Sequence, residues 1–155
     1  MKILFLDIDG VLNSADFIIK RKYDLVLSFL SYPLSEFDPL AVERVNTILN
    51  KTNAKLVISS DWRFTEGLDN ILKKAGLRYP IYDITPYGMG KDRGYEIQEW
   101  LDEHDDIENY AIIDDINNML DSQQSHFIQT SEIHGLTEDL MELTIKILNN
   151  NENEK

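Results

Sequence analysis

The chain has 155 residues, which fits one ordinary domain, and its hydrophobic content of 43% is enough for a substantial core. It contains no cysteine, which excludes disulfide bonds, thiolate metal sites and a cysteine nucleophile. The 28 acidic and 15 basic residues give a formal charge of -13, which argues against broad electrostatic capture of DNA or RNA, so we expect no strong non-specific binding to nucleic acid.

The first predicted element is a strand at residues 3–8, an almost wholly apolar run typical of a strand covered on both faces in a parallel sheet. Residues 13–38 have mixed character, with a basic cluster followed by an apolar run. They fit either a flap over a functional site or a surface excursion that packs its own apolar face. A helix is predicted at residues 39–52, with Asp38 as its N-cap.

The middle of the chain continues the alternation of strands and helices. Residues 55–60 form a second apolar strand, which ends in polar side chains. Residues 65–75 predict a helix closed by a glycine, and residues 80–84 predict a weaker strand. A third helix is predicted at residues 94–103.

The last third of the chain has the same design. Residues 110–115 form an apolar strand that ends in carboxylates, and a short helical turn is predicted from there to about residue 122. A weak strand at residues 126–130 and a helix at residues 137–149 follow. The tail at residues 150–155 has low complexity and is expected to be disordered.

This alternation predicts an α/β fold, a Rossmann-like three-layer sandwich with a central parallel sheet of about five strands. Residues 1–149 are expected to form a single domain. Chemistry in such folds belongs at the carboxyl ends of the strands.

Targeting signals are not evident in the sequence. The apolar run before Asp7 is too short for the central region of a signal peptide. No later stretch approaches the roughly 18 uninterrupted apolar residues of a membrane span. We therefore expect a cytoplasmic protein with no membrane partner.

Asp7 and Asp9 stand two residues apart where the first strand ends, and Gly10 permits the bend that would bring both carboxylates to one place. At the carboxyl edge of a sheet, one carboxylate can attack phosphorus while its neighbour donates and then abstracts a proton. An Asp-x-Asp-Gly string is otherwise an ordinary turn, and the apolar strand before it favours the functional interpretation.

Asp114 and Asp115 end another apolar strand. Two adjacent carboxylates there repel each other and are poorly solvated, and a hard cation such as Mg²⁺ resolves both problems. The alternative is a solvated strand end followed by an Asp-capped helix. Because polar side chains recur at three strand ends, we favour the metal site.

Ser59 and Ser60 end the apolar strand at residues 55–60, which lies in the sequence between the strands that end at Asp7 and at Asp114. Either hydroxyl could hold a phosphoryl oxygen or cap a helix instead. Phosphoryl transfer also needs fixed positive charge near the transferred group. The candidates are Lys91 and Arg93, next to a predicted helix N-terminus, and Arg63, each of which could also be a solvated surface charge.

The order of these residues resembles the four motifs of the haloacid dehalogenase-like (HAD) superfamily of hydrolases. The matching stretches are residues 5–13 (FLDIDGVLN), 57–63 (VISSDWR), 93–97 (RGYEI) and 112–115 (IIDD). The Ser-x-Trp-Arg element, the Glu-Ile-Gln-Glu-Trp-Leu helix and the late Gly-Leu-Thr are similar to a small branch of HAD domains associated with RNA-repair proteins. The resemblance covers nearly the whole chain.

The resemblance implies that Asp7 is the nucleophile, which forms an aspartyl phosphate, and that Asp9 is the general acid and base and offers its backbone carbonyl to Mg²⁺. Asp115 and Asp114 would complete the metal site with Asp7. Ser59 matches the hydroxyl of the second motif best, because it directly follows the apolar run.

Several assignments stay open under this resemblance. Ser60 remains an alternative to Ser59 and is a candidate for substrate binding together with Arg63 and Asn13. Arg93 stands where the family has a Lys or Arg, but Lys91 could serve instead.

The gaps between the motifs leave no room for a large cap domain, and the resemblance then implies an open site suited to large or exposed phosphates. We therefore expect a Mg²⁺-dependent phosphomonoesterase that acts on a nucleic-acid end, such as a 3'-phosphate, or on a nucleotide. The phosphorylated substrate is then its partner, and the oligomeric state stays unknown.

A local funnel of basic residues and a stacking surface would favour the nucleic-acid end. The basic candidates are Lys20, Arg21, Lys22, Arg63, Lys91 and Arg93. The aromatic candidates are Trp62, Phe64 and Tyr87, although such residues are more often ordinary packing residues. A 5'-nucleotidase or general small-molecule phosphatase with the same chemistry is the alternative, and a catalytically idle binding domain is the alternative from another class.

Overall fold

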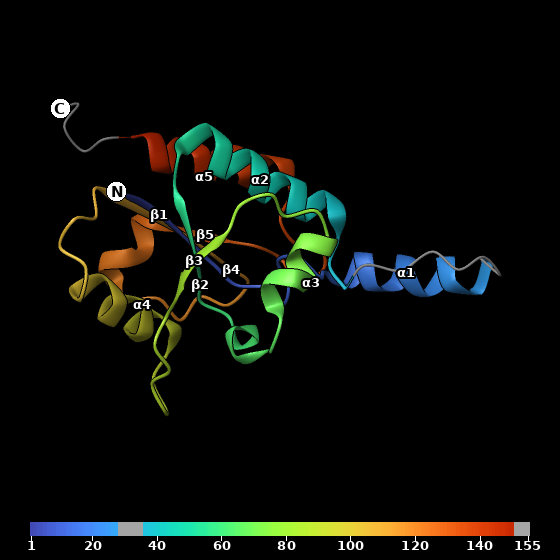
Figure 1. The fold of residues 1–155 in the computed structure, drawn as a ribbon, viewed down its shortest axis with the longest axis horizontal. Coiled ribbons are helices and arrows are strands. Elements are labelled where there is room, and N and C mark those ends of the chain that lie inside the picture. Colours follow the sequence, from blue (N-terminus) through green and yellow to red (C-terminus); the bar gives the residue numbers. More distant parts are fainter. Residues whose placement is uncertain (28–35, 151–155) are drawn as a thin grey trace.

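The computed structural model describes residues 1–27 and 36–150. Its centre is a five-stranded parallel sheet with the strand order β3-β2-β1-β4-β5 (Figure 1). The strands are β1 (Lys2–Leu6), β2 (Lys55–Ile58), β3 (Ile81–Ile84), β4 (Asn109–Asp114) and β5 (Phe127–Gln129). The predicted α/β sandwich is therefore confirmed, with the earliest apolar run as the central strand.

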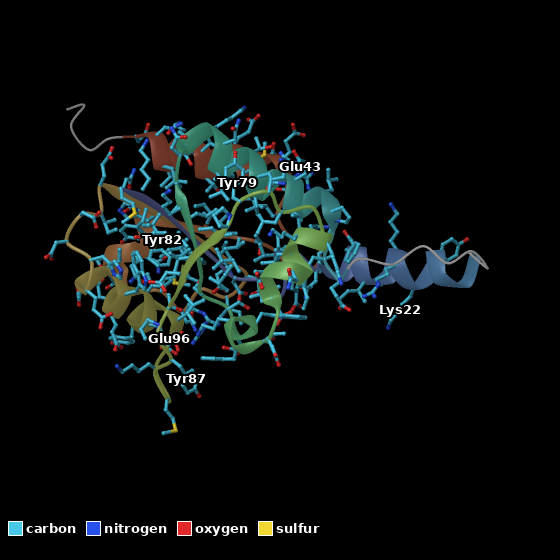
Figure 2. The ribbon with its side chains drawn as sticks, viewed as in Figure 1. Lys22, Glu43, Tyr79, Tyr82, Tyr87 and Glu96 are labelled. Atoms are coloured by element: carbon cyan, nitrogen blue, oxygen red, sulfur yellow. The ribbon has the colours of Figure 1, made fainter. Side chains whose placement is uncertain are left out.

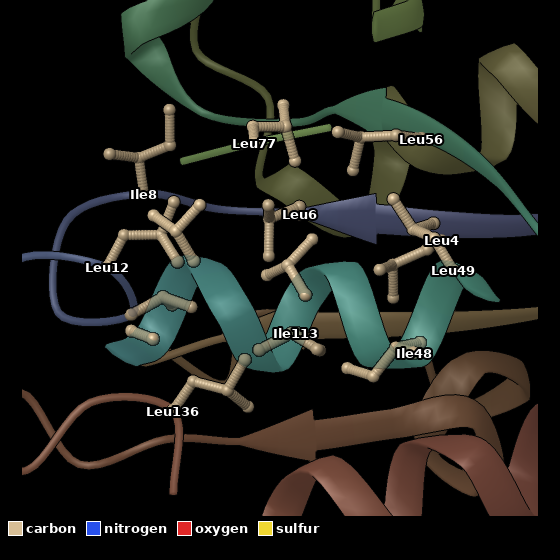
Figure 3. Close-up of a cluster of buried hydrophobic side chains, with 14 of the residues drawn as sticks. Leu4, Leu6, Ile8, Leu12, Ile48, Leu49, Leu56, Leu77, Ile113 and Leu136 are labelled. Atoms are coloured by element: carbon tan, nitrogen blue, oxygen red, sulfur yellow. The ribbon is translucent and has the colours of Figure 1, made fainter. Parts of the chain in front are cut away.

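Helices cover both faces of this sheet, because successive side chains of a strand point to opposite faces. Leu4 and Leu6 of β1 belong to one buried cluster, whereas Ile3 and Phe5 belong to another. The first face is covered by α2 (Pro39–Thr52), α3 (Leu68–Lys74) and α5 (Glu138–Asn149), and the second face by α4 (Arg93–Asp102). Figure 3 shows the first cluster, in which Ile48 and Leu49 of α2 pack on the strands.

The helix α2 begins as the sequence predicts. The carboxylate of Asp38 accepts a hydrogen bond from the Leu40 N–H at 3.0 Å, and Pro39 occupies the first turn, where its missing N–H costs nothing. The helix ends at Asn53, whose φ of 55° is left-handed.

Two predicted helical segments differ from the structure. The helix predicted at residues 65–75 begins only at Leu68, because Gly67 has a φ of 74° there, and the 3-10 helix η1 (Asp61–Phe64) precedes it. The helical turn predicted after Asp115 is wrong, since the chain forms the 3-10 helix η2 (Asp121–His126) further on. The Asp114 carboxylate accepts a hydrogen bond from the Ile116 N–H at 3.0 Å, and this bond competes with the backbone hydrogen bonds of a helical turn at this point.

Part of the excursion predicted at residues 13–38 forms the helix α1 (Ala15–Leu27), which extends away from the body of the molecule (Figure 1). Its first turn is attached to the loop after β5, because the N–H groups of Ala15 and Asp16 bind the carbonyls of Glu132 and Ile133. Residues 28–35 of this excursion lie outside the described residues, so the choice between a flap and a surface excursion stays a prediction.

The two ends of the described chain meet at the amino edge of the sheet. Lys2 Nζ donates to Asn149 Oδ1 at 3.2 Å, so the start of β1 lies beside the end of α5. Residues 151–155 of the predicted disordered tail lie outside the described residues.

Within the described ranges, helices and loops connect the strands and no large cap is inserted between them, as expected. None of the helices described there has the length and hydropathy that a membrane-spanning segment needs.

Candidate active site

The first motif turns sharply where β1 ends. The Asp7 N–H still donates to the Ile113 carbonyl at 2.9 Å, which holds this residue against β4. The N–H groups of Val11 and Leu12 then both donate hydrogen bonds to the Ile8 carbonyl, at 3.1 and 2.9 Å. The predicted bend after Asp9 is therefore present at the carboxyl edge of the sheet.

Gly10 lies against the fourth motif. It has a φ of 72°, and a Cβ built at this position would lie 2.6 Å from Asp115 Cγ. The Gly10 carbonyl accepts a hydrogen bond from the Thr130 hydroxyl at 2.9 Å, which ties the bend to the end of β5. Glycine is thus needed twice, for its backbone conformation and for the close approach of Asp115.

The structure brings together three of the predicted metal ligands. One carboxylate oxygen from each of Asp7, Asp114 and Asp115 lies within 4.8 Å of the others. Asp7 and Asp114 are buried, and Asp115 is half-buried. Burial raises the pKa of Asp7 to about 6, and burial together with the charge of Asp7 raises the pKa of Asp114 to about 7.

These carboxylates fit Mg²⁺. The ion prefers oxygen ligands, and buried carboxylates that repel one another are stabilised by a divalent cation placed between them. The donor set of Asp7, Asp114 and Asp115 meets this requirement without a histidine or a thiolate. The predicted fourth contributor, Asp9, lies two residues along the same bend.

The Asp9 side chain is exposed and contacts one neighbour on the first-motif turn and one on η1. Its Oδ1 accepts hydrogen bonds from Asn13 Nδ2 at 2.7 Å and from Trp62 Nε1 at 2.9 Å. Asn13 Oδ1 in turn accepts the Gly10 N–H at 2.9 Å, so Asn13 holds the motif turn. Trp62 rests edge-to-face on Phe37 at a centroid distance of 5.0 Å, which fixes the indole that donates to Asp9.

The two serines after β2 have different surroundings. The Ser60 hydroxyl lies near Asp7 and opposes the rise in the pKa of that carboxyl, and it caps η1 by accepting the Trp62 N–H at 3.3 Å. Ser59 Oγ is fully buried and has no hydrogen-bond partner among the residues that the structure describes. Ser60 therefore contacts the nucleophile candidate, while Ser59 keeps an unused hydroxyl.

Arg93 and Lys91 lie in different places. Arg93, the first residue of α4, places Nε 3.7 Å from Asp114 Oδ2, and its charge lowers the pKa of Asp7. Lys91 Nζ instead forms an ion pair with Glu99 at 3.2 Å, further along α4. Of the two predicted cations, the geometry favours Arg93 for the phosphoryl group.

Arg63, predicted to bind substrate, is wholly buried. Its Nη2 lies 3.0 Å from Glu96 Oε1, and its Nη1 donates to the Ser60 carbonyl at 3.1 Å. Glu96 binds Arg93 Nη1 with its other oxygen, Oε2, also at 3.0 Å. The two guanidinium groups therefore share one buried carboxylate, and Arg63 contacts it rather than open solvent.

The predicted basic funnel is only partly assembled. Arg63 and Arg93 come together at Glu96, but Lys22 lies on α1, far from Glu96 and Tyr87 (Figure 2). Arg21, also on α1, lies 4.0 Å from Glu36.

Sequence reasoning missed Glu96 as part of the site. The spacing of three residues between Arg93 and Glu96 on a predicted helix was an available signal, because such pairs face each other. The Trp62 contact with Asp9 was also missed, since Trp62 was considered only as a stacking or packing residue.

Residues 3–141 match the family described as the HAD domain in Swiss Army Knife RNA repair proteins. Searches of curated proteins and of solved structures found no match. The matched range contains all of the site residues described above, from Asp7 to Asp115, and spans the sheet. The chain therefore belongs to the family of HAD domains found in Swiss Army Knife RNA repair proteins.

Proposed function

We propose that this domain is a Mg²⁺-dependent phosphomonoesterase that works through an aspartyl phosphate on Asp7. The observation that carries the proposal is the convergence of three carboxylates at the carboxyl edge of the sheet, beside Arg93. Membership of a HAD family supports phosphatase chemistry in general.

Each residue has a part in this reaction. An Asp7 carboxylate oxygen attacks phosphorus, and the bond from phosphorus to the leaving oxygen breaks while Asp9 donates a proton to that oxygen. Asp9 then takes a proton from water, whose oxygen attacks the phosphorus and releases phosphate from Asp7. Arg93 offsets the negative charge on the phosphoryl oxygens, and the Ser60 hydroxyl favours the ionised form of Asp7 by lowering its pKa.

Mg²⁺, held by Asp7, Asp114, Asp115 and the Asp9 carbonyl, would supply positive charge against the phosphoryl oxygens and let Asp7 ionise despite its burial. Asp9 is exposed, and its carboxylate accepts hydrogen bonds from Asn13 and Trp62. A leaving group or a water can replace these donors at the Asp9 carboxylate and exchange a proton with it.

For the substrate we propose a nucleic-acid end, with a 3'-phosphate as the first choice. The description of the family, which refers to RNA repair proteins, and the fold without a large cap both support an exposed phosphate at a chain end. The net charge of -13 favours the second candidate, a mononucleotide, because a strongly acidic surface repels a long phosphate backbone.

The test is phosphate release from a panel of p-nitrophenyl phosphate, 5'- and 3'-mononucleotides, and oligonucleotides phosphorylated at either end. We expect release that needs Mg²⁺, stops with EDTA, and falls by about 10³-fold or more in Asp7→Asn, since a nucleophile is removed without a change of shape. Asp69→Asn, an exposed carboxylate on α3, is the matched control and should keep full activity.

The panel also separates the candidates. A preference for an oligonucleotide end supports the first substrate, and a preference for mononucleotides supports the second. Undiminished release in Asp7→Asn would refute the proposed nucleophile, and an absence of release from every substrate would favour an idle binding domain.

A further inference from the structure

Two exposed aromatic rings lie side by side on the loops that follow β2 and β3. Phe64, at the end of η1, is 61% exposed, and Tyr87 is 62% exposed. Their ring centroids are 5.7 Å apart with an interplanar angle of 86°. Because β2 and β3 run parallel to β1, both rings lie at the carboxyl edge of the sheet, the same edge as Asp7.

The two rings pack against the buried Arg63 guanidinium rather than against the hydrophobic core. The Arg63 guanidinium lies 4.8 Å from the Phe64 centroid and 5.9 Å from the Tyr87 centroid, both within the range of a cation–π contact. Neither ring belongs to the two hydrophobic clusters of the described residues. Packing of the core therefore does not account for this pair of aromatic residues.

The same charge connects the rings to the phosphoryl site. Glu96 binds Arg63 with one oxygen and Arg93 with the other, and Arg93 reaches Asp114. Glu96 also accepts the Gly88 N–H at 3.1 Å, which fixes the backbone next to Tyr87. Figure 2 shows Tyr87 and Glu96 close together in the lower part of the view.

We propose that Phe64 and Tyr87 form the binding surface for the base of the nucleotide that carries the phosphate. This inference rests on the proposed function and adds to it the part of the substrate that is recognised. A planar base fits because exposed aromatic rings bind any base by stacking, while Arg93 at the acidic cluster holds its phosphate.

The charge of the chain favours such recognition. With a formal charge of -13, the protein gains little from contacts with a long phosphate backbone, and Arg63 and Arg93 are already paired with Glu96. Uncharged contacts with the terminal base are then the main source of affinity beyond the phosphate itself.

The experiment measures binding separately from turnover. An Asp7→Asn protein is titrated into fluorescent oligonucleotides with a 3'-phosphate, of which one carries a normal terminal base and the other lacks that base. We expect roughly tenfold tighter binding when the base is present, the scale of one base–aromatic stack. The double variant Phe64→Leu/Tyr87→Leu in the same background should lose this difference, because leucine keeps the apolar character but not the ring.

Tyr82→Leu is the matched control, since Tyr82 is 47% exposed on β3 and lies apart from Tyr87 (Figure 2). It should keep the tenfold difference, and thermal unfolding should show that all variants are folded. Equal affinity for the two oligonucleotides, no binding of either, or a difference that survives the double substitution would overturn the proposal.

Phosphate release by the chain with Asp7 intact is measured on the same two oligonucleotides. If phosphate is released from neither oligonucleotide, the proposed function fails. The ratio of the two affinities, with and without the terminal base, tests only the aromatic surface. The two failures are therefore distinguishable.

Discussion

At Gly10 the backbone φ of 72° and the adjacent Asp115 carboxylate impose two separate demands on one residue. Gly67 offers a comparison, because its φ of 74° is nearly the same while no atom of the described residues beyond its chain neighbours lies within 4 Å of the Cβ position. Substituting each glycine by alanine therefore separates the cost of a left-handed backbone from the cost of a steric contact with Asp115.

We expect Gly10→Ala to abolish Mg²⁺ binding and phosphate release, because the new methyl group displaces Asp115 from the acidic cluster. Gly67→Ala should leave both unchanged, although each variant loses about 1–2 kcal/mol of stability from a left-handed alanine. Calorimetric titration with Mg²⁺ and thermal unfolding check the two effects. Wild-type affinity for Mg²⁺ in Gly10→Ala would contradict the contact with Asp115.

Single residues at the strand ends were predictable to a good extent. Asp7, Asp114 and Asp115 follow apolar runs, and parallel strands bring their carboxyl ends to one edge, so their convergence follows from the pattern. The different surroundings of Ser59 and Ser60 depend on the path of the chain between the end of β2 and η1, of which Ser60 is the N-cap. The sequence motif therefore did not determine which of the two adjacent serines lies near Asp7.

At the scale of elements, the N-terminal turn of α4 joins η1 through Glu96. The buried Glu96 carboxylate compensates two guanidinium groups, so its charge holds Arg93 toward Asp114 and Arg63 beneath Phe64. Breaking a buried ion pair on one side typically costs about 3–5 kcal/mol, because the remaining charge is uncompensated.

We expect Glu96→Gln to destabilise the domain and to lower kcat/KM by roughly tenfold or more, since a hydrogen bond to a charged group contributes about 1.5–3 kcal/mol. The double variant Arg63→Met/Glu96→Gln should recover stability, because one uncompensated charge is gone, but it should not recover activity. Thermal unfolding and steady-state kinetics separate the two properties.

Glu99→Gln is the control for this experiment, because Glu99 lies on the same helix in an exposed pair with Lys91. It should change neither property. Recovery of full activity in the Arg63→Met/Glu96→Gln variant would show that Glu96 does not position Arg93.

Elements were predicted best where their own sequence determines them. The apolar strands and the capped helix α2 appear as expected, whereas the turn after Asp115 does not. In that segment the Asp114 side chain accepts a hydrogen bond from the Ile116 N–H, and the Gln123 side chain accepts one from the Leu120 N–H. These contacts depend on individual polar side chains rather than on helical periodicity. The attachment of α1 to the carbonyls of Glu132 and Ile133 joins segments more than a hundred residues apart, which no local pattern indicates.

At the scale of the whole molecule, the acidic cluster links folding to pH. The folded protein binds protons more tightly at Asp7 and Asp114 than the unfolded chain does, because burial raises both pKa values. The stabilisation that these protons provide is fully present below the usual pKa of about 4 and is lost as the pH rises through about 7.

In EDTA, we therefore expect the melting temperature to fall as the pH is raised from about 5 to 8, and Mg²⁺ at the higher pH should restore it by binding the folded state. The Asp114→Asn variant should show a flatter pH profile and a weaker response to Mg²⁺. Differential scanning calorimetry across this range is the measurement. Parallel profiles for the two proteins would disprove the assignment of the effect to this cluster.

The contact between Lys2 and Asn149 has a practical consequence for handling the protein. Both residues lie at the amino edge of the sheet, whereas Asp7 and the aromatic pair lie at the carboxyl edge. A linker attached beside either residue therefore leaves from the side opposite the acidic cluster. Immobilisation on a sensor surface, or fusion to another folded module, can use either position and still leave the carboxyl edge of the sheet open to the oligonucleotides of the proposed tests.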